Sequence, residues 1–190
     1  MEEESGRGMW IEAGLKEIGR SGVEGVRVEV LAAHLGITKG GFYRRFQGRR
    51  ALLDALLHTW QRGRIAAIEK QTELAGERAG QRLKSLIQLY SERLNPEAMA
   101  IELAVRQWAR SDAAASAAVE SVDAARLSNV AQLYRRLGWS AEEARARSGL
   151  FYAFIFGQSL IFLGPSLRKR ASMTAACADM LIDEPALDGR

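Results

Sequence analysis

The side chains best suited to chemistry in this chain are cations that crowd into one short stretch. Residues 36–50 contain five basic residues and no acid. The chain has 27 basic and 23 acidic residues, a net charge of +4, so the remainder carries 22 against 23. A cluster of this kind suits a polyanionic partner, although charge alone fits a solvated basic face equally well. The five cations are Lys39, Arg44, Arg45, Arg49 and Arg50.

No other pattern points to catalysis or to a bound metal. His34 and His58 are far apart in sequence, and Cys177 is the single cysteine, which leaves no disulfide and too few thiols for a zinc site. The sequence has no nucleophile elbow, no phosphate-binding loop and no HExxH motif. The acidic pair Glu142–Glu143 is explained by helix capping. We therefore expect no enzymatic activity, no metal and no cofactor.

The elements that position the cations are predicted to be helices throughout. Apolar residues recur at helical spacing, and no segment alternates with the period of a strand. Glycine, proline and capping residues mark the ends of the helical segments, so we expect an all-α fold of nine helices. The expected ranges are 9–18, 28–35, a short helix after Thr38, 49–74, 81–94, 96–110, 112–137, one from about 141 to 163, and 166–182.

The second and third helices have the spacing of a helix-turn-helix. Two short helices that cross steeply need a small residue at the crossing and a residue that tolerates positive φ in the turn. Ala32 and Gly36 meet these needs at the right spacing. The apolar residues predicted to face inward are Leu31, Leu35, Ile37, Phe42 and Phe46.

The stretch from Trp10 to Leu57 resembles the DNA-binding domain of TetR-family transcriptional repressors. The matching motifs include Leu31-Ala32, Leu35-Gly36-Ile37-Thr38-Lys39-Gly40 and Phe42-Tyr43, about a quarter of the chain. The chain departs from the family at two positions, with Arg45 where the family often has His and Arg49 where it often has Lys. Both replacements are cationic, so contact with phosphate is expected to survive with altered geometry.

This resemblance implies a DNA-binding domain over residues 1–50 whose third helix reads operator DNA. Glycines within a helix cost up to about 1 kcal/mol each relative to alanine, and their bare backbone would let the helix press closely on DNA. Arg44 is expected to point outward toward a guanine or a phosphate. The predicted DNA-binding residues are Val28, Thr38, Lys39, Gly40, Gly41, Tyr43, Arg44, Arg45 and Arg49.

The resemblance also implies a regulatory ligand-binding and dimerisation domain over residues 51–190. Large residues on separate helices could converge on an apolar pocket with a few polar groups beside them, although aromatic residues on amphipathic helices are more often core. An aromatic or lipophilic effector is expected. The predicted ligand-binding residues are Trp60, Tyr90, Gln107, Trp108, Tyr134 and Phe154.

The last two helices are the predicted dimer surface. Residues 150–163 are apolar on nearly every face, so their outer side needs a cover from a partner or from the rest of the chain. Small residues four apart, Ala153 and Gly157, would let a partner helix approach closely. The predicted interface residues are Ala153, Phe156, Gly157 and Leu160.

Together these features predict a homodimeric repressor that a small ligand releases from a palindromic operator. The alternative is a helix-turn-helix protein whose second domain binds another protein or no ligand. We expect a soluble, cytoplasmic protein, because the first residues are acidic and the apolar run at 150–163 is too short to span a bilayer. Its 47% hydrophobic and 26% charged residues fit that class.

Overall fold

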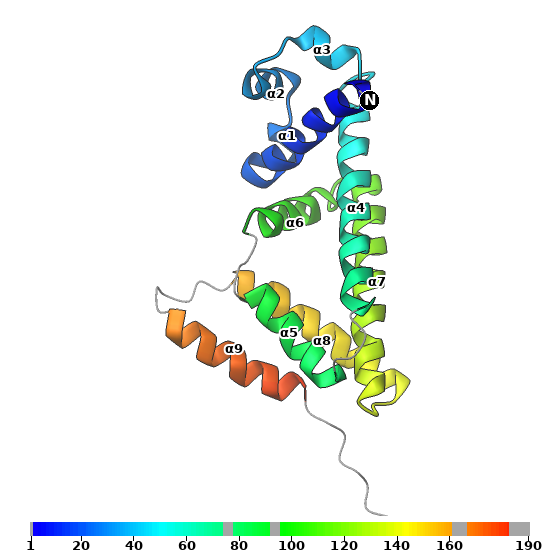
Figure 1. Cartoon of the computed structure of the whole chain (residues 1–190), viewed down its shortest axis with the longest axis vertical. Coiled ribbons are helices and arrows are strands. Elements are labelled where there is room, and N and C mark those ends of the chain that lie inside the picture. The colour runs from blue at the N-terminus through cyan, green and yellow to red at the C-terminus, as the bar shows by residue number, and fades with distance from the viewer. Residues whose placement is uncertain (1, 74–77, 92–95, 161–166, 183–190) are drawn as a thin grey trace, which may run out of the picture. The chain divides into compact units, whose positions relative to one another are not determined.

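The structure is a computed structural model that describes residues 2–73, 78–91, 96–160 and 167–182. These residues form nine helices and no strand (Figure 1). The predicted all-α class is therefore confirmed. The helices are α1 (Glu2–Gly25), α2 (Val28–Leu35), α3 (Lys39–Tyr43), α4 (Arg49–Glu73), α5 (Ala79–Ser91), α6 (Pro96–Trp108), α7 (Ala113–Arg136), α8 (Ala141–Leu160) and α9 (Leu167–Leu181).

The first helix differs most from its predicted bounds. It begins at Glu2, seven residues before the predicted start at Met9, and continues to Gly25. Gly22 has a φ of 71°, a left-handed conformation that kinks the helix where the sequence analysis placed a loop. The acidic and glycine-containing start looked unlike a helix in isolation. Its packing against other helices supplies the stabilisation that its propensity lacks.

Several helix ends follow the predicted chemistry. Gly36 ends α2 with a φ of 65°, and its N–H donates to the carbonyls of Ala32 and Ala33. The capping box at the start of α8 is present, because the Glu143 N–H donates to Ser140 Oγ at 3.2 Å and the Ser140 N–H donates to the Glu143 carboxylate at 3.2 Å. The predicted cap at Ser166 lies outside the described residues.

The chain divides into two compact units that interleave along the sequence. Unit 1 comprises residues 1–67 and 95–123, and unit 2 comprises residues 68–94 and 124–190. These contacts group α6 and the start of α7 with the helix-turn-helix, whereas the sequence analysis divided the chain at residue 50. The functional division at residue 50 remains a prediction.

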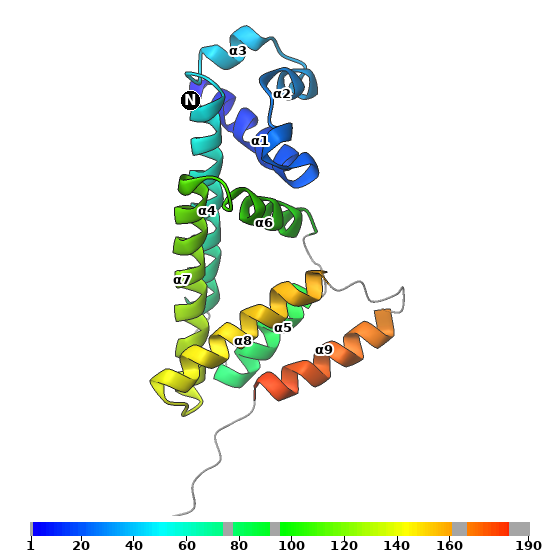
Figure 2. The same cartoon turned by 180° about the vertical axis from the view of Figure 1, so that it is seen from behind.

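In unit 1, α1 packs between α2 and α6 (Figures 1 and 2). The ring of Trp10 meets Phe42 edge-on with centroids 5.1 Å apart, and Phe46 stacks on Phe42 at 5.3 Å. All three rings are at least 97% buried. At Gly19 a Cβ would come 3.0 Å from Ile101 of α6, so this glycine sets how closely the two helices approach.

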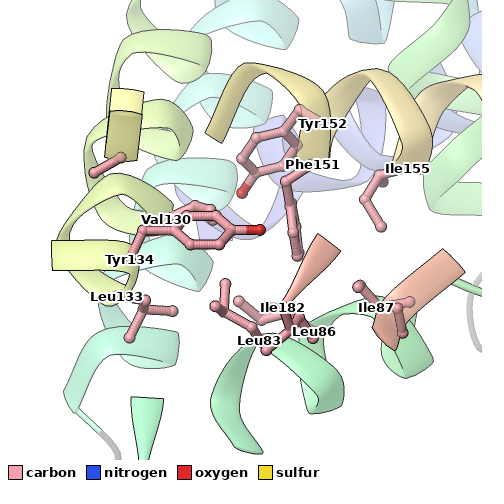
Figure 3. Close-up of a cluster of buried hydrophobic side chains, with 12 residues drawn as sticks. Leu83, Leu86, Ile87, Val130, Leu133, Tyr134, Phe151, Tyr152, Ile155 and Ile182 are labelled. Atoms are coloured by element: carbon pink, nitrogen blue, oxygen red, sulfur yellow. The ribbon is translucent and has the colours of Figure 1, made fainter. Parts of the chain in front are cut away.

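In unit 2, α5, α7, α8 and α9 enclose a separate apolar core (Figure 3). Tyr134 projects from α7 into this cluster beside Phe151 of α8, and its hydroxyl donates to the Leu181 carbonyl of α9 at 2.8 Å. No helix among the described residues is both long enough and apolar enough to cross a membrane.

Candidate nucleic-acid interface

The helix-turn-helix predicted from Ala32 and Gly36 is present as α2, a tight turn and α3. Thr38 is the N-cap residue of α3, as predicted, but its hydroxyl makes no capping hydrogen bond. Leu31, Phe42 and Phe46 are buried, and Leu35 is half-buried. Ile37, predicted to face inward, is 38% exposed, because the turn after Gly36 carries it away from the core.

A surface of exposed residues runs along α3 and its flanks, and we call it the recognition surface. Its members are all at predicted DNA-binding positions. Tyr43 is the largest and is 63% exposed. The recognition surface consists of Thr38, Lys39, Gly40, Tyr43 and Arg44.

Two predicted DNA-binding residues are buried instead. Val28 is only 7% exposed, because it opens α2 on the side that faces the core. Gly41 is also buried within α3. Any contact that either residue makes with DNA would have to come from its backbone.

Lys39 is exposed but paired. Its ammonium lies 2.8 Å from a carboxylate oxygen of Glu29 on α2. The hydrogen bond from Lys39 lowers the pKa of the Glu29 carboxyl. An approaching phosphate would therefore compete with Glu29 for this cation.

Arg44 and Arg45 are adjacent but differ in their surroundings. Arg44 is exposed, and its guanidinium has no hydrogen-bond or ion-pair partner within the described parts of the chain, although its backbone N–H donates to the Gly40 carbonyl at 3.4 Å. Arg45 is half-buried, and its Nη1 donates to the Gly41 carbonyl of α3 at 2.9 Å. Arg45 therefore serves the fold, while Arg44 is available to a partner.

Arg49 joins the start of α4 to the end of α1. Its Nε donates to the Val26 carbonyl at 2.7 Å and its Nη2 donates to the Val23 carbonyl at 2.6 Å. Carbonyls at a helix end carry partial negative charge, so they supply the anionic environment that an arginine at the start of α4 requires. The family resemblance predicts that Arg49 contacts phosphate, whereas in the structure its guanidinium donates to these backbone carbonyls.

Arg50 is held on both sides by acids. Its Nε donates to Asp54 at 2.8 Å, one turn along α4, and its Nη1 donates to Asp112 at 2.6 Å. Asp112 also accepts hydrogen bonds from the N–H groups of Ala114 and Ala115 at the start of α7. These bonds and the Arg50 guanidinium lower the pKa of the Asp112 carboxyl.

The protein itself thus engages four of the five clustered cations, and the positive charge offered outward is smaller than the sequence suggests. Sequence reasoning missed the partners because most of them are distant in the chain. Glu29 precedes Lys39 by ten residues, and Asp112 follows Arg50 by 62. Backbone carbonyls such as that of Val23 leave no trace in the sequence.

The six predicted ligand-binding residues are divided between the two compact units. Trp60, Gln107 and Trp108 belong to unit 1. Tyr90, Tyr134 and Phe154 belong to unit 2, where they share one apolar cluster. Trp60 and Trp108 are each 5% exposed and Gln107 is exposed.

A cavity of about 260 Å³ lies within unit 1 and includes Trp108 in its wall. Two arginines and two acids are among the eight residues that line it. This charged lining differs from the apolar ligand pocket that the sequence predicts. The lining residues are Val23, Glu24, Arg49, Arg50, Leu53, Trp108, Ser111 and Asp112.

A buried carboxylate in unit 1 takes part in a network of charged side chains. Glu102 is 1% exposed and lies 3.2 Å from Arg64 of α4 and 3.0 Å from Arg106 of its own helix. Arg106 also donates to Asp123 of α7 at 2.9 Å. This network ties α4, α6 and α7 together, so these charges compensate one another within the protein.

Three of the four predicted dimer residues lie on an accessible face of α8. Ala153 is exposed, Leu160 is 63% exposed, and a Cβ at Gly157 would meet no atom within 4 Å. Phe156 is different, because it packs against the core of unit 2 and stacks on Tyr152 with centroids 6.2 Å apart. Among the described residues, no group of His, Cys, Asp and Glu could hold a metal ion.

Residues 11–56 match the family described as bacterial regulatory proteins of the tetR family. A transcriptional regulator fold from Saccharomonospora viridis, solved in complex with choline, is 15% identical, with a TM-score of 0.76 over 94% of this chain and 96% of that chain. A protein described as a tetR-family transcriptional regulator from Mesorhizobium loti is 16% identical, with a TM-score of 0.72 over 96% and 95%. The reduced form of NemR from E. coli is 15% identical, with a TM-score of 0.70 over 95% and 100%. The sequence matches no curated protein.

The family match covers α2, α3, the turn between them and the first residues of α4, and so includes every residue of the recognition surface. The similar structures cover nearly the whole chain, with both compact units. The chain therefore carries the N-terminal helix-turn-helix domain of the tetR family and has the fold of its transcriptional regulators.

Proposed function

We propose that this protein is a homodimeric transcriptional repressor that binds a palindromic operator and releases it when a small ligand binds. The recognition surface carries this proposal. Its polar and cationic groups project from a helix-turn-helix that rigid aromatic packing holds together. The work of a repressor on chromosomal DNA would place it in the cytoplasm.

The groups on the recognition surface suit the two kinds of contact that operator binding needs. Arg44 presents an unpaired guanidinium that can bind guanine through two hydrogen bonds or contact a phosphate. Lys39, Thr38 and the Tyr43 hydroxyl can contact phosphates, which fix the register of the protein on the duplex. Two copies about one DNA turn apart, roughly 34–36 Å, would read both half-sites.

The experiment that tests this proposal is a binding assay with Arg44→Ala. An operator selected from genomic fragments is measured against random duplex over a series of salt concentrations. If Arg44 reads a base, the variant loses operator affinity while its affinity for random DNA changes little. If Arg44 contacts phosphate in both subunits, the log–log salt slope flattens by about 2.

Arg135→Ala is the matched control, because Arg135 is also exposed but lies at the end of α7 in unit 2. We expect this control to bind both DNAs as the unmodified protein does. Wild-type protein that binds no genomic fragment better than random duplex would refute the proposed function.

The dimer is proposed to form through one stripe on α8. Leu150, Ala153, Gly157 and Leu160 follow one another at helical spacing, so they lie on the same face. Both leucines are more than 60% exposed, although they are large and apolar. A second copy of the chain would cover this face, with the small residues between the leucines allowing close approach.

The effector is proposed to be a small aromatic or lipophilic molecule bound among the helices that follow α4. The choline complex of the similar structure from S. viridis supports binding of a small organic molecule by this fold. Titration of the protein–operator complex with such compounds should release DNA and change tryptophan fluorescence, and choline is tested beside them as a small hydrophilic cation. Reciprocity then requires the operator to weaken ligand binding by the same factor.

The alternative function is a helix-turn-helix regulator whose second domain binds a protein or no ligand. Two features favour it. The predicted ligand residues of unit 2 serve its own core, and the charges of Glu102 and its partners compensate one another. An operator complex that no compound in the titration disturbs would support this alternative.

A further inference from the structure

The start of α1 packs against the residues that directly follow the recognition helix α3. Gly6 is buried there, and a Cβ at this position would overlap the guanidinium of Arg45, with Nη2 and Nε as its nearest atoms. Gly8, two residues later, is exposed, and a Cβ on it would meet nothing within 4 Å. A side chain at residue 6 would therefore displace the Arg45 guanidinium, whereas one at residue 8 would displace nothing.

Arg7 extends the same contact on the next residue. Its guanidinium carbon lies 4.6 Å from the centroid of the Phe46 ring, and its Nη1 donates to the Arg45 carbonyl at 3.4 Å. Phe46 in turn stacks on Phe42 in the core beneath α3. The start of α1 thus contacts two consecutive residues just after the recognition helix.

Arg45 passes this contact on to α3. Its Nη1 donates to the Gly41 carbonyl at 2.9 Å, which satisfies an acceptor near the C-terminal end of a helix of only five residues. A cation suits that end of a helix. The Arg45 Nε is buried without a hydrogen-bond partner, so this part of the guanidinium is shielded from solvent.

We infer that Gly6 and Arg7 hold Arg45 against the recognition helix, and that Arg45 is a positioning residue for α3 instead of a contact to DNA. The inference rests on the proposed function for its effect on operator binding. A helix of five residues that contains Gly40 and Gly41 is too short and too flexible to hold its own end. The contact with α1 supplies the missing constraint.

The first test compares Gly6→Ala with Gly8→Ala in the full-length protein. Both changes give α1 the same gain in helix propensity, but only Gly6→Ala displaces the Arg45 guanidinium. Without DNA, Gly6→Ala should show faster hydrogen exchange than Gly8→Ala at the amides of Arg45 and Phe46. These amides donate to the Phe42 carbonyl at 2.8 and 3.0 Å. Identical exchange in the two variants would overturn the inference without any measurement on DNA.

The second test measures operator binding of Gly6→Ala, Arg45→Ala and the double variant. Each single change should weaken operator binding by about tenfold, and Gly6→Ala should add nothing in the Arg45→Ala background, because coupled residues are not additive. The salt slope of Arg45→Ala should remain that of the unmodified protein. A slope flatter by about 2 per dimer would make Arg45 a phosphate contact in each subunit and refute the inference.

These tests separate the inference from the proposed function. A protein that binds no operator would still show the exchange difference between Gly6→Ala and Gly8→Ala if Arg45 is held as described. Operator binding that is identical in Gly6→Ala and Gly8→Ala would leave the proposed function standing and overturn the positioning role. A single cooperative melting transition at a similar temperature in Gly6→Ala and Gly8→Ala would confirm that the effects are local.

Discussion

At the scale of single residues, Arg44 and Gly40 present the clearest contrast with their neighbours. Both are exposed on the recognition surface, whereas Gly41 and Val28 are buried. Gly40 has an ordinary helical φ, and a Cβ on it would have only Thr38 Oγ1 nearby, at 3.7 Å. Neither backbone conformation nor packing within the chain therefore explains glycine at this position.

Gly40→Ala should stabilise the protein and weaken operator binding at the same time. The added methyl raises helix propensity by up to about 1 kcal/mol, since nothing in the chain opposes it. The same methyl stands where DNA would approach, so operator affinity should fall severalfold. Thermal melting and fluorescence anisotropy with labelled operator measure the two effects on one sample.

Gly63→Ala is the control for this change. Gly63 is exposed within α4, and a Cβ on it would meet no atom within 4 Å. It should give a similar rise in stability with no change in operator affinity. If Gly40→Ala binds operator as well as Gly63→Ala does, close approach of DNA is not the reason for this glycine.

At the scale of elements, one hydroxyl joins α7 to α9. Tyr134 is fully buried and donates to the Leu181 carbonyl. Burial raises its pKa to about 12, with a small opposing effect from the nearby cation Arg147. The native state therefore holds this proton more tightly than the unfolded chain, whose tyrosines titrate near pH 10.

Stability should consequently fall as the pH rises from about 10 toward 12. Below pH 10 the hydroxyl is protonated in both the native and the unfolded state, so it does not make the free energy of unfolding depend on pH. Above pH 10 the unfolded state loses the proton first, so the free energy of unfolding falls by about 1 kcal/mol by pH 11. Urea unfolding at pH 8, 10 and 11 measures this loss.

Tyr134→Phe isolates the effect from other alkaline titrations. The variant should be about 1 kcal/mol less stable at pH 8, because the Leu181 carbonyl loses its donor. Between pH 10 and 11 its stability should decline less steeply than that of the unmodified protein. Parallel declines in the two proteins would mean that Tyr134 titrates normally in the native state.

At the scale of the whole molecule, the proposed dimer would bind two half-sites at once, and each half-site alone would be bound weakly. Leu160→Glu places a charge on the exposed stripe of α8, where a partner chain would bury it. Sedimentation should then show monomers, and operator affinity should fall to that for random DNA. One half-site supplies only part of the binding free energy.

Leu89→Glu is the matched control for this prediction. Leu89 is an exposed leucine of α5, with 41% of its surface accessible, and is not part of the stripe. The control should remain dimeric and bind operator normally. A dimer that persists in Leu160→Glu would place the interface elsewhere on the molecule.

The sequence alone determined the helices and the turn that carry the recognition surface. Gly36, Gly138 and the Ser140–Glu143 pair act within one turn of chain, so their spacing is visible in the sequence and their geometry follows from it. The burial of Phe42 and Phe46 also followed from local periodicity. The same kind of information located Thr38, Lys39, Tyr43 and Arg44, because each is defined by its place on one short helix.

Tertiary structure decided which of the clustered cations are available. Arg49 donates to the carbonyls of residues 23 and 26, and Arg50 donates to Asp112. Arg45 packs against Gly6 of α1, a helix whose start at residue 2 the sequence did not indicate. The predicted ligand residues likewise divide between two units, which join segments far apart in the chain. A charge pattern records how many cations are present. Only the folded chain determines which acceptor each cation contacts, because most of those acceptors are backbone carbonyls or distant acids that local spacing does not encode.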